Sequence, residues 1–306
     1  MDVTPCADHH LPGIRSLAAA ALDLPEDAGE TDAILRRLLA PPPGRRTVRV
    51  VAPDGSGAVT GVVFASVRDR EPEVGHLDLI AVHPAARRQG VARTLVAAAE
   101  QALLRYGVRE VRIAGNDPCY AWPGIDVRYT PAVCLALALG YEQERTAWNM
   151  TADLSALPDT TDAQARLAAK GVTVRRATAA DAETVGGCAA EHFGQGWSWE
   201  VREAIARGDA GEVAGCHIAL RGDEVLGFAA YGALRPSLFG PMGTLPAARG
   251  SGIGALLLVR CLAGQRAAGL ATAQIGWAGP VAFYSRTIGA RIGRVFVLYR
   301  KLLTGR

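Results

Sequence analysis

The sequence predicts a mixed α/β (α+β) protein built from two similar domains in tandem, each with a largely antiparallel sheet. Three observations lead to this prediction: the length of 306 residues, an internal repeat, and the same order of helical and extended segments in both halves. This length suits two domains of ordinary size, and a hydrophobic content of 49% suffices for packed cores.

The internal repeat is clearest around two glycine-rich segments. Residues 82–92 (VHPAARRQGVA) correspond to residues 244–254 (TLPAARGSGIG), so that Pro84 and Pro246 are 162 positions apart. Further on, Gly140 corresponds to Gly289 at an offset of 149, so the first half carries 13 extra residues, the difference between the two offsets. A repeat of this length indicates duplicated domains and not a solenoid.

The boundary between the halves is expected in a polar, proline-containing stretch at 152–161, a composition typical of linkers. We therefore expect an N-terminal domain at 1–153, a linker at 154–171 and a C-terminal domain at 172–306.

Hydrophobic periodicity and turn residues predict the same elements in each half. In the first half we expect helices at 10–22, 31–40, 90–105 and 131–139, and strands at 46–52, 58–68, 74–83, 110–113 and 145–152. In the second half we expect helices at 179–190, 199–207, 252–267 and 279–287, and strands at 172–176, 213–220, 224–232, 238–245, 271–276 and 293–302.

Both glycine-rich segments have the properties of an anion-binding loop. Each follows a strand and a proline and precedes an apolar helix. Glycine lets backbone amides turn inward and lets a phosphate approach closely, while the helix N-terminus adds unpaired N–H groups and the positive end of its dipole. Arg87 and Arg249 carry charges suited to a phosphate. Because two such segments occur in the same context, a tight turn without a binding role is the poorer explanation.

Composition excludes several classes of protein. The net charge of +3 with no Lys/Arg-rich run argues against nucleic-acid binding, and no apolar stretch approaches the roughly 20 residues that cross a bilayer. The six cysteines show no CxxC pair or metal-ligand spacing, so no metal site is predicted. Without a signal-peptide pattern at the N-terminus, we expect a cytoplasmic protein.

The segment from Arg249 to Gly254 (RGSGIG) resembles the pyrophosphate-binding loop of the GNAT superfamily of N-acetyltransferases, and 87–92 (RRQGVA) is similar. The resemblance covers about 5–152 and 172–302. It implies that acetyl-CoA is the co-substrate, that the strand before the second loop splays from its neighbour, and that a backbone amide near Gly243 meets the thioester carbonyl. The cofactor-binding residues that it implies are Gly243, Thr244, Leu245, Arg249, Gly250, Ser251, Gly252, Ile253 and Gly254, with Arg87, Arg88, Gln89, Gly90, Val91 and Ala92 in the first copy.

Acyl transfer from a thioester to an amine needs an oriented thioester, a donor to the oxyanion and a proton for the leaving sulfur. In this superfamily the proton donor is often a tyrosine on the last helix, and Tyr284 lies at the matching place. The repeat aligns Leu135 with Tyr284, and leucine cannot donate a proton. We therefore expect catalysis in the C-terminal domain and a non-catalytic N-terminal domain. Tyr120 or Tyr129 of the inserted segment is the alternative donor.

Two segments are candidates for contact with the acceptor. The inserted segment at 116–129 either lies over the neighbouring domain or packs on its own. The stretch 191–200 joins two helices in a region that lines the acceptor pocket of similar enzymes, so Glu191, His192 and Trp197 are predicted substrate-binding residues. Trp197 and Trp199 are equally consistent with a core position.

The sequence therefore predicts an acetyl-CoA-dependent N-acetyltransferase whose partner is a small primary amine. The two-domain layout is similar to that of bacterial amino-sugar N-acetyltransferases, so an amino sugar is the leading acceptor. The other acceptors considered are an antibiotic amine, a polyamine, and a protein N-terminus or lysine. The alternative from another class is a non-catalytic acetyl-CoA sensor. The oligomeric state is not predicted.

Overall fold

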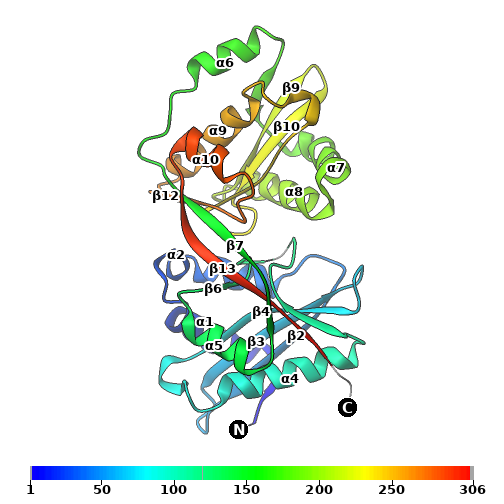
Figure 1. Cartoon of the computed structure of the whole chain (residues 1–306), viewed down its shortest axis with the longest axis vertical. Helices are drawn as coiled ribbons and strands as arrows, with labels where there is room; N and C mark the ends of the chain where they lie inside the picture. Colours follow the sequence, from blue (N-terminus) through cyan, green and yellow to red (C-terminus); the bar gives the residue numbers. More distant parts are fainter. Residues whose placement is uncertain (1, 119, 304–306) are drawn as a thin grey trace. The chain divides into compact units, whose positions relative to one another are not determined.

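A computed structural model describes residues 2–118 and 120–303. The chain forms two compact units (Figure 1). Unit 1 comprises the described residues of 1–147 and 295–306, and unit 2 comprises 148–294. This division differs from the predicted one at 153 and 172, because the last strand of each half of the sequence contributes to the sheet of the other unit.

Unit 1 has a mixed sheet with helices on both faces. Its strands are β1 (Thr4–Pro5), β2 (Arg45–Pro53), β3 (Val59–Arg68), β4 (Val74–Val82), β5 (Glu110–Ile113), β6 (Ile125–Asp126) and the second part of β13 (Arg291–Leu302). Its helices are α1 (Leu11–Ala21), α2 (Pro25–Ala28), α3 (Thr31–Leu39), α4 (Val91–Arg105) and α5 (Thr130–Ala138), with 3-10 turns η1 (Asp8–His10) and η2 (Pro84–Ala86). The sheet order is β1-β2-β3-β4-β5-β13, antiparallel except for β4 and β5.

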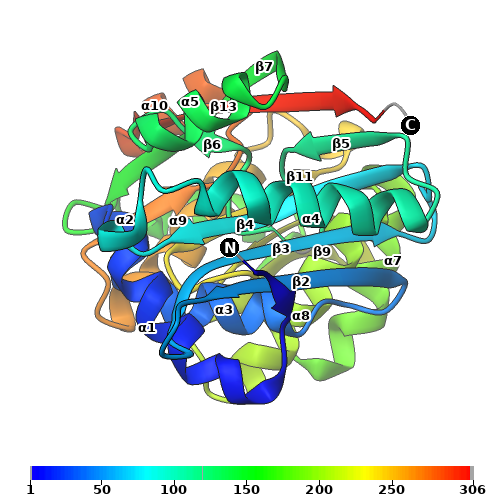
Figure 2. The ribbon, with the colours of Figure 1, turned by 90° about the horizontal axis from the view of Figure 1, so that it is seen from below.

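Side chains alternate along β3 and thereby build two cores. Val62 and Phe64 pack with α1 and α3, whereas Val63 and Ala65 pack with α4 on the other face. Figure 2 shows α4 lying across β2, β3 and β4. The sheet of unit 1 is thus covered on both faces, as its run of buried residues in β3 requires.

Unit 2 repeats this arrangement. Its strands are the second part of β7 (Glu142–Asp153), β8 (Thr173–Arg176), β9 (Gly215–Arg221), β10 (Glu224–Tyr231), β11 (Leu238–Thr244) and β12 (Thr272–Ile275). Its helices are α6 (Thr161–Ala168), α7 (Ala182–Phe193), α8 (Gln195–Asp209), α9 (Ile253–Ala267) and α10 (Val281–Ile288), with 3-10 turns η3 (Ala179–Asp181) and η4 (Pro246–Ala248). The sheet order is β7-β12-β11-β10-β9-β8, with β11 and β12 parallel. Helices α7 and α8 pack on one face, and α9 and α10 pack on the other.

The segment predicted as the linker, 154–171, contains a helix, most of which lies in its second half. It contains α6, whose Leu167 is 3% exposed and packs in the same core as α9. Its alanine-rich composition favours a helix, and Leu167 and Val172 supply the apolar anchors that a free linker lacks. In the described part of the chain, no helix is long and apolar enough to span a bilayer.

The exchanged strands are integral to both units. In unit 1, Tyr299 of β13 pairs with Ile113 of β5 and is buried in the core beneath α4. Lys301 of the same strand lies 2.8 Å from Glu100 of α4, which also accepts a 2.8 Å hydrogen bond from the Tyr141 hydroxyl. In unit 2, Met150 of β7 pairs with Ile275 of β12. Neither half of the sequence therefore contains all the strands of one unit.

A chain that ends at Ala290 tests this dependence. It lacks β13, so β5 loses its antiparallel neighbour and the core beneath α4 loses Val297 and Tyr299. We expect the β5 amides to exchange with deuterium much faster than in the full chain and unit 1 to lose cooperative unfolding. A chain that ends at Leu303 is the control. Unchanged protection of β5 in the shorter chain would contradict the structural role of β13.

Candidate active site

The two glycine-rich loops have the same backbone conformation. Each begins with a 3-10 turn and ends at a left-handed glycine that caps the following helix, with φ +84° at Gly90 and +91° at Gly252. The second residue of each loop is also left-handed, with φ +66° at Arg88 and +75° at Gly250. An ordinary side chain is strained in this conformation, so Arg88 marks a departure from the glycine of the second loop.

The space beside the glycines of these loops is open. Gly250 and Gly252 are exposed, and a Cβ placed on either glycine would meet no described atom within 4 Å. The first N–H groups of α4 and α9 have no acceptor within their own helices. Val91 and Ala92, like Gly254, therefore offer donors at the positive end of a helix dipole, which is a geometry suited to a pyrophosphate. The Ile253 N–H donates to the Ser251 hydroxyl at 3.4 Å.

The loop side chains support this backbone. The Arg249 Nε donates to the carbonyl of Thr244 at 3.4 Å, and the Arg87 Nε donates to that of Val82 at 3.3 Å. These exposed arginines are therefore tied to the end of the preceding strand. In the second loop the Ser251 hydroxyl donates to the carbonyl of Ala248 at 2.6 Å, and in the first loop the Gln89 amide donates to that of Ala85 at 3.2 Å.

The strand before each loop separates from its parallel neighbour. In unit 2, β11 pairs with β12 at Leu238 and Phe239, and β11 then continues to Thr244 while β12 ends at Ile275. In unit 1, β4 pairs with β5 at 74–76 and continues to Val82. Both strands also carry a register shift against their antiparallel neighbour. The sheet is therefore open along the last part of β11, which leads to the second loop and has no pairing with β12.

The register identifies the amides that face this opening. Leu245 donates its N–H to the carbonyl of Leu226 beside β10, and Gly243 pairs with Phe228 of β10. Because backbone groups alternate sides along an extended strand, the amide of Gly243 faces β10 as that of Leu245 does. The amides of Met242 and Thr244 face the opening. Sequence reasoning identified Thr244 and did not identify Met242.

Tyr284 lies on α10 against the opened strand. Its ring packs edge-on against Phe239 of β11 at 6.3 Å and against Phe283 at 5.2 Å. A Cβ on Gly254 would lie 3.7 Å from Phe283 Cζ, so the helix also contacts the start of α9. Tyr284 is 6% exposed, and its burial raises the pKa of the phenol to about 12. The hydroxyl therefore stays protonated at neutral pH.

Residues from the first half of the sequence fix the turn that precedes α10. The N–H of Trp277 donates to Asn149 Oδ1 at 2.9 Å, and the N–H of Ala278 donates to the carbonyl of Trp148 at 2.9 Å. Asn149 is 1% exposed. The exchanged strand β7 thus positions the helix that carries Tyr284. In unit 1 the corresponding position on α5 is Leu135, which has no proton to donate.

The predicted acceptor-binding residues lie at the junction of α7 and α8. Glu191 and His192 are exposed, with Glu191 Oε2 4.0 Å from His192 Nε2. Trp197 packs in the core of α7 and α8, where it stacks on Phe193 at 5.1 Å and lies edge-on to Phe228. Both Trp197 and Phe193 keep part of their surface exposed, so a role in substrate binding stays a prediction for Glu191, His192 and Trp197.

Comparison with known proteins agrees with this geometry. Residues 13–121 match the sequence profile of the acetyltransferase (GNAT) family. A mycothiol acetyltransferase from Salinispora arenicola is 32% identical over 145 residues, which cover 45% of this chain and 41% of that protein. The chain therefore spans about two fifths of the length of this curated relative.

Solved structures cover the whole chain. A tandem GNAT protein from the clavulanic acid biosynthesis pathway is similar with a TM-score of 0.72 and 18% identity, over 100% of this chain and 99% of that one. A fungal glucosamine N-acetyltransferase region of a multi-domain β-N-acetylglucosaminidase gives 0.76 and 17%, over 98% of this chain and 38% of that one. The sequence match to the GNAT family is confined to residues 13–121. Units 1 and 2 together share the fold of a tandem GNAT protein.

The profile match falls within unit 1, whereas Tyr284 lies in unit 2. The matched residues, 13–121, end before α5 and therefore do not include the position of Leu135. In the described residues, no group of three or more His, Cys, Asp or Glu side chains is arranged to hold a metal ion.

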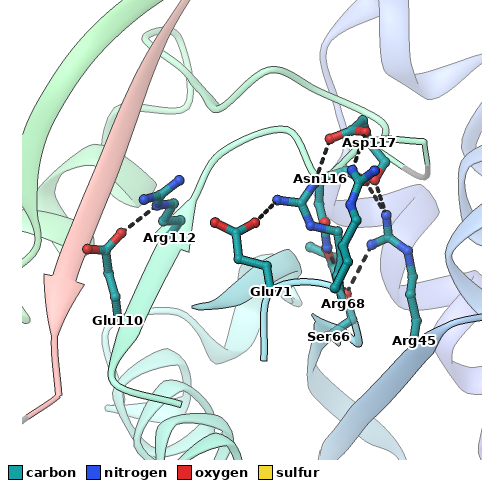
Figure 3. A network of polar contacts seen from close by, with 10 residues as sticks. Arg45, Ser66, Arg68, Glu71, Glu110, Arg112, Asn116 and Asp117 are labelled. Atoms are coloured by element: carbon teal, nitrogen blue, oxygen red, sulfur yellow. Dashed lines mark hydrogen bonds and ion pairs between the residues drawn. The ribbon is translucent and has the colours of Figure 1, made fainter. Parts of the chain in front are cut away.

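The inserted segment of unit 1 packs on its own unit, one of the two predicted arrangements. Figure 3 shows this packing: Arg45 donates hydrogen bonds to the main-chain carbonyls of Asn116 and Asp117, and Arg68 donates to the Asp117 carboxylate. Further along, the Trp122 indole N–H donates to Asp27 Oδ1 at 3.0 Å. Tyr129 also bonds to Asp27, with 3.2 Å between its hydroxyl and Oδ2. Cys119 lies outside the described residues.

Sequence reasoning missed a buried polar cluster beneath this segment. Asp78 lies at the register shift of β4, where it accepts hydrogen bonds from the Ser66 hydroxyl at 2.7 Å and the Asn116 amide at 3.1 Å. Burial raises the pKa of Asp78 to about 6 against the effect of these two donors. Burial, with the nearby Arg68 charge, lowers the pKa of His76 to about 3. A single Asp and His in a predicted strand gave no signal of this cluster.

Asp78→Asn tests the electrostatics of the cluster. Because the folded chain raises the pKa of Asp78, the stability that this group contributes is full below its ordinary pKa of 3.8 and is lost as pH rises through about 6. The neutral amide avoids this loss. We therefore expect the urea midpoint of the variant to rise relative to wild type between pH 4 and pH 7. The exposed Asp2→Asn is the control, and a constant difference between Asp78→Asn and wild type across that range would be the contrary result.

Proposed function

We propose that this chain is an acetyl-CoA-dependent N-acetyltransferase that acts on the primary amine of a small molecule, with catalysis in unit 2. The observation that supports this most directly is the combination, within one unit, of an open phosphate loop, an opened strand and a tyrosine beside that strand. Unit 1 has the first two features and carries Leu135 in place of the tyrosine. The N-terminal domain is therefore proposed to be non-catalytic.

The proposed reaction forms a C–N bond to the amine and breaks the C–S bond of acetyl-CoA. The amine nitrogen donates its lone pair to the carbonyl carbon of acetyl-CoA, so that a C–N bond forms and the oxygen becomes negatively charged. When the carbonyl re-forms, the C–S bond breaks and the CoA sulfur leaves with the electron pair. The sulfur takes one proton and the amine nitrogen loses one to solvent or to a side chain. Amides of the opened strand are suited to stabilising the oxyanion.

Tyr284 is proposed to supply the hydrogen bond to the leaving sulfur. A thiol has an ordinary pKa of about 8.5, so full proton transfer from a phenol with a pKa of about 12 is uphill by about 5 kcal/mol. Donation of a hydrogen bond as the C–S bond breaks costs less than complete transfer. The phenol therefore serves as a donor that stays protonated, and solvent completes the protonation.

An amino sugar is the proposed class of acceptor. The name of one similar structure specifies a glucosamine N-acetyltransferase region. The half-exposed Phe193 and Trp197 provide aromatic surface on which a sugar ring can pack. Glu191 and His192 lie beside them and are candidates to fix the ammonium group or accept its proton. A strong base is unnecessary where the amine titrates near neutral pH.

The alternatives are separated by one assay. Thiol release from acetyl-CoA is measured with glucosamine, chitobiose-type fragments, aminoglycosides, polyamines and a lysine peptide. Turnover on one class identifies the acceptor and supports the enzyme. Binding of acetyl-CoA without thiol release on any amine would favour the non-catalytic sensor.

Tyr284→Phe keeps the packing against Phe239 and removes the hydroxyl. We expect kcat to fall by about 100-fold, at the lower end of the usual contribution of a positioned proton donor. The Kd for acetyl-CoA should change little, because the hydroxyl acts at the breaking C–S bond. Equal kcat in the variant and wild type would remove Tyr284 from the mechanism.

The two loops provide a matched pair of substitutions. Gly252→Glu and Gly90→Glu place a carboxylate at left-handed positions with nearly the same φ, so their backbone strain is similar. We expect Gly252→Glu to abolish turnover, because the carboxylate repels the pyrophosphate, and Gly90→Glu to retain much of it. Thermal unfolding of both variants separates misfolding from lost binding. Equal loss of turnover in two folded variants would mean that unit 1 takes part directly.

A further inference from the structure

Phe193 occupies the space where residue 243 would otherwise have a side chain. A Cβ placed on Gly243 would lie 2.5 Å from Phe193 Cζ and 2.7 Å from Cε2. Distances this short exclude any side chain at 243 while the ring stays in place. Sequence reasoning did not identify this contact, because nothing in a helix-end phenylalanine indicates its partner on a strand 50 positions later.

The ring lies on one defined face of the opened strand. Met242 packs on the α9 face, and the Thr244 hydroxyl oxygen would lie 3.3 Å from a Cβ on Gly254, also on that face. Because side chains alternate along a strand, residue 243 faces α7 and α8. Phe193 therefore covers the opened strand between Met242 and Thr244, on the face of the sheet opposite α9.

The ring is held firmly in this place. It stacks on Trp197 with an interplanar angle of 11° and packs edge-on against the buried Phe228 at 5.5 Å. The turn that brings α7 to an end directly after Phe193 uses Gly194 at φ +106° and ψ 163°. This is a conformation that is essentially restricted to glycine. Aromatic packing and the glycine turn thus fix the ring without leaving it fully buried.

The first unit lacks this arrangement. The position that corresponds to Gly243 is Ala81, which is 4% exposed and packs in the core beneath α1 and α3. Gly243 and Phe193 are therefore a pair that belongs to the unit with Tyr284.

We infer that Phe193 sets the length of the acyl group that unit 2 accepts. This inference rests on the proposed function, in which the thioester carbonyl meets an amide of the opened strand. From that point an acetyl methyl group fits beside the ring of Phe193, whereas each further methylene of a longer chain is directed against the ring or must displace it. A rigid wall of this kind discriminates one methylene by about 10- to 200-fold.

Binding of acyl-CoA tests the inference without knowledge of the acceptor. The affinities of CoA and of acetyl-, propionyl- and butyryl-CoA are measured by calorimetry for the wild type, Phe193→Ala and Phe193→Leu. Trp148→Ala is the matched control, because it removes a half-buried aromatic side chain that packs with the core on the α9 face. Thermal unfolding shows which variants are folded, and Phe193→Leu keeps the test valid if the alanine variant does not fold.

We expect the wild type and Trp148→Ala to bind butyryl-CoA at least about tenfold more weakly than acetyl-CoA. Phe193→Ala should remove this difference, Phe193→Leu should reduce it, and neither should change the affinity for CoA itself. Equal affinities for acetyl- and butyryl-CoA in the wild type, or an unchanged ratio in a folded Phe193 variant, would overturn the inference. The predicted pattern of affinities in a protein that acetylates no amine would instead support the acyl pocket and contradict the proposed function.

Discussion

The separation of β11 from β12 is the constraint on which the rest of the site depends. A buried or half-buried backbone N–H needs an acceptor, and beyond Phe239 the strand has lost the parallel neighbour that would provide one on that side. Met242 and Thr244 therefore present amides to whatever enters the opening. The loop that follows adds the helix N-terminus of α9, which is a geometry suited to an anion.

The gap beside the end of β11 requires that the neighbouring strands stay paired elsewhere in the sheet. In unit 2 the strand that borders β12 on its other side is β7, which comes from the first half of the sequence. The same strand binds the turn before α10 through Asn149 and the carbonyl of Trp148. The position of Tyr284 is therefore set by residues more than 120 positions earlier in the chain, and the duplicated halves depend on one another for the geometry of the site.

The repeat and the local patterns predicted the elements closely, because hydrophobic periodicity and capping glycines act over a few residues. The start of α9 after Gly252 and the end of α10 before Gly289 are examples. The strand exchange was not predictable, since the last strand of either half satisfies the same local pattern in either unit. The contact of Phe193 with Gly243 and the polar cluster around Asp78 were missed for the same reason, because each depends on residues distant in the sequence.

The two units of this duplicated fold share a backbone arrangement and differ in the side chains beside the opened strand. Both keep the opened strand and the left-handed glycine, because these are properties of the backbone that fix the fold around the loop. Unit 1 has filled the space beside its strand with Ala81 and with the polar cluster of Asp78, Ser66 and Asn116, which anchors the inserted segment. Unit 2 has kept glycine at 243 and covered it with an aromatic ring. Burial keeps the Tyr284 phenol protonated, and in the proposed mechanism such a donor is what the departing thiolate requires.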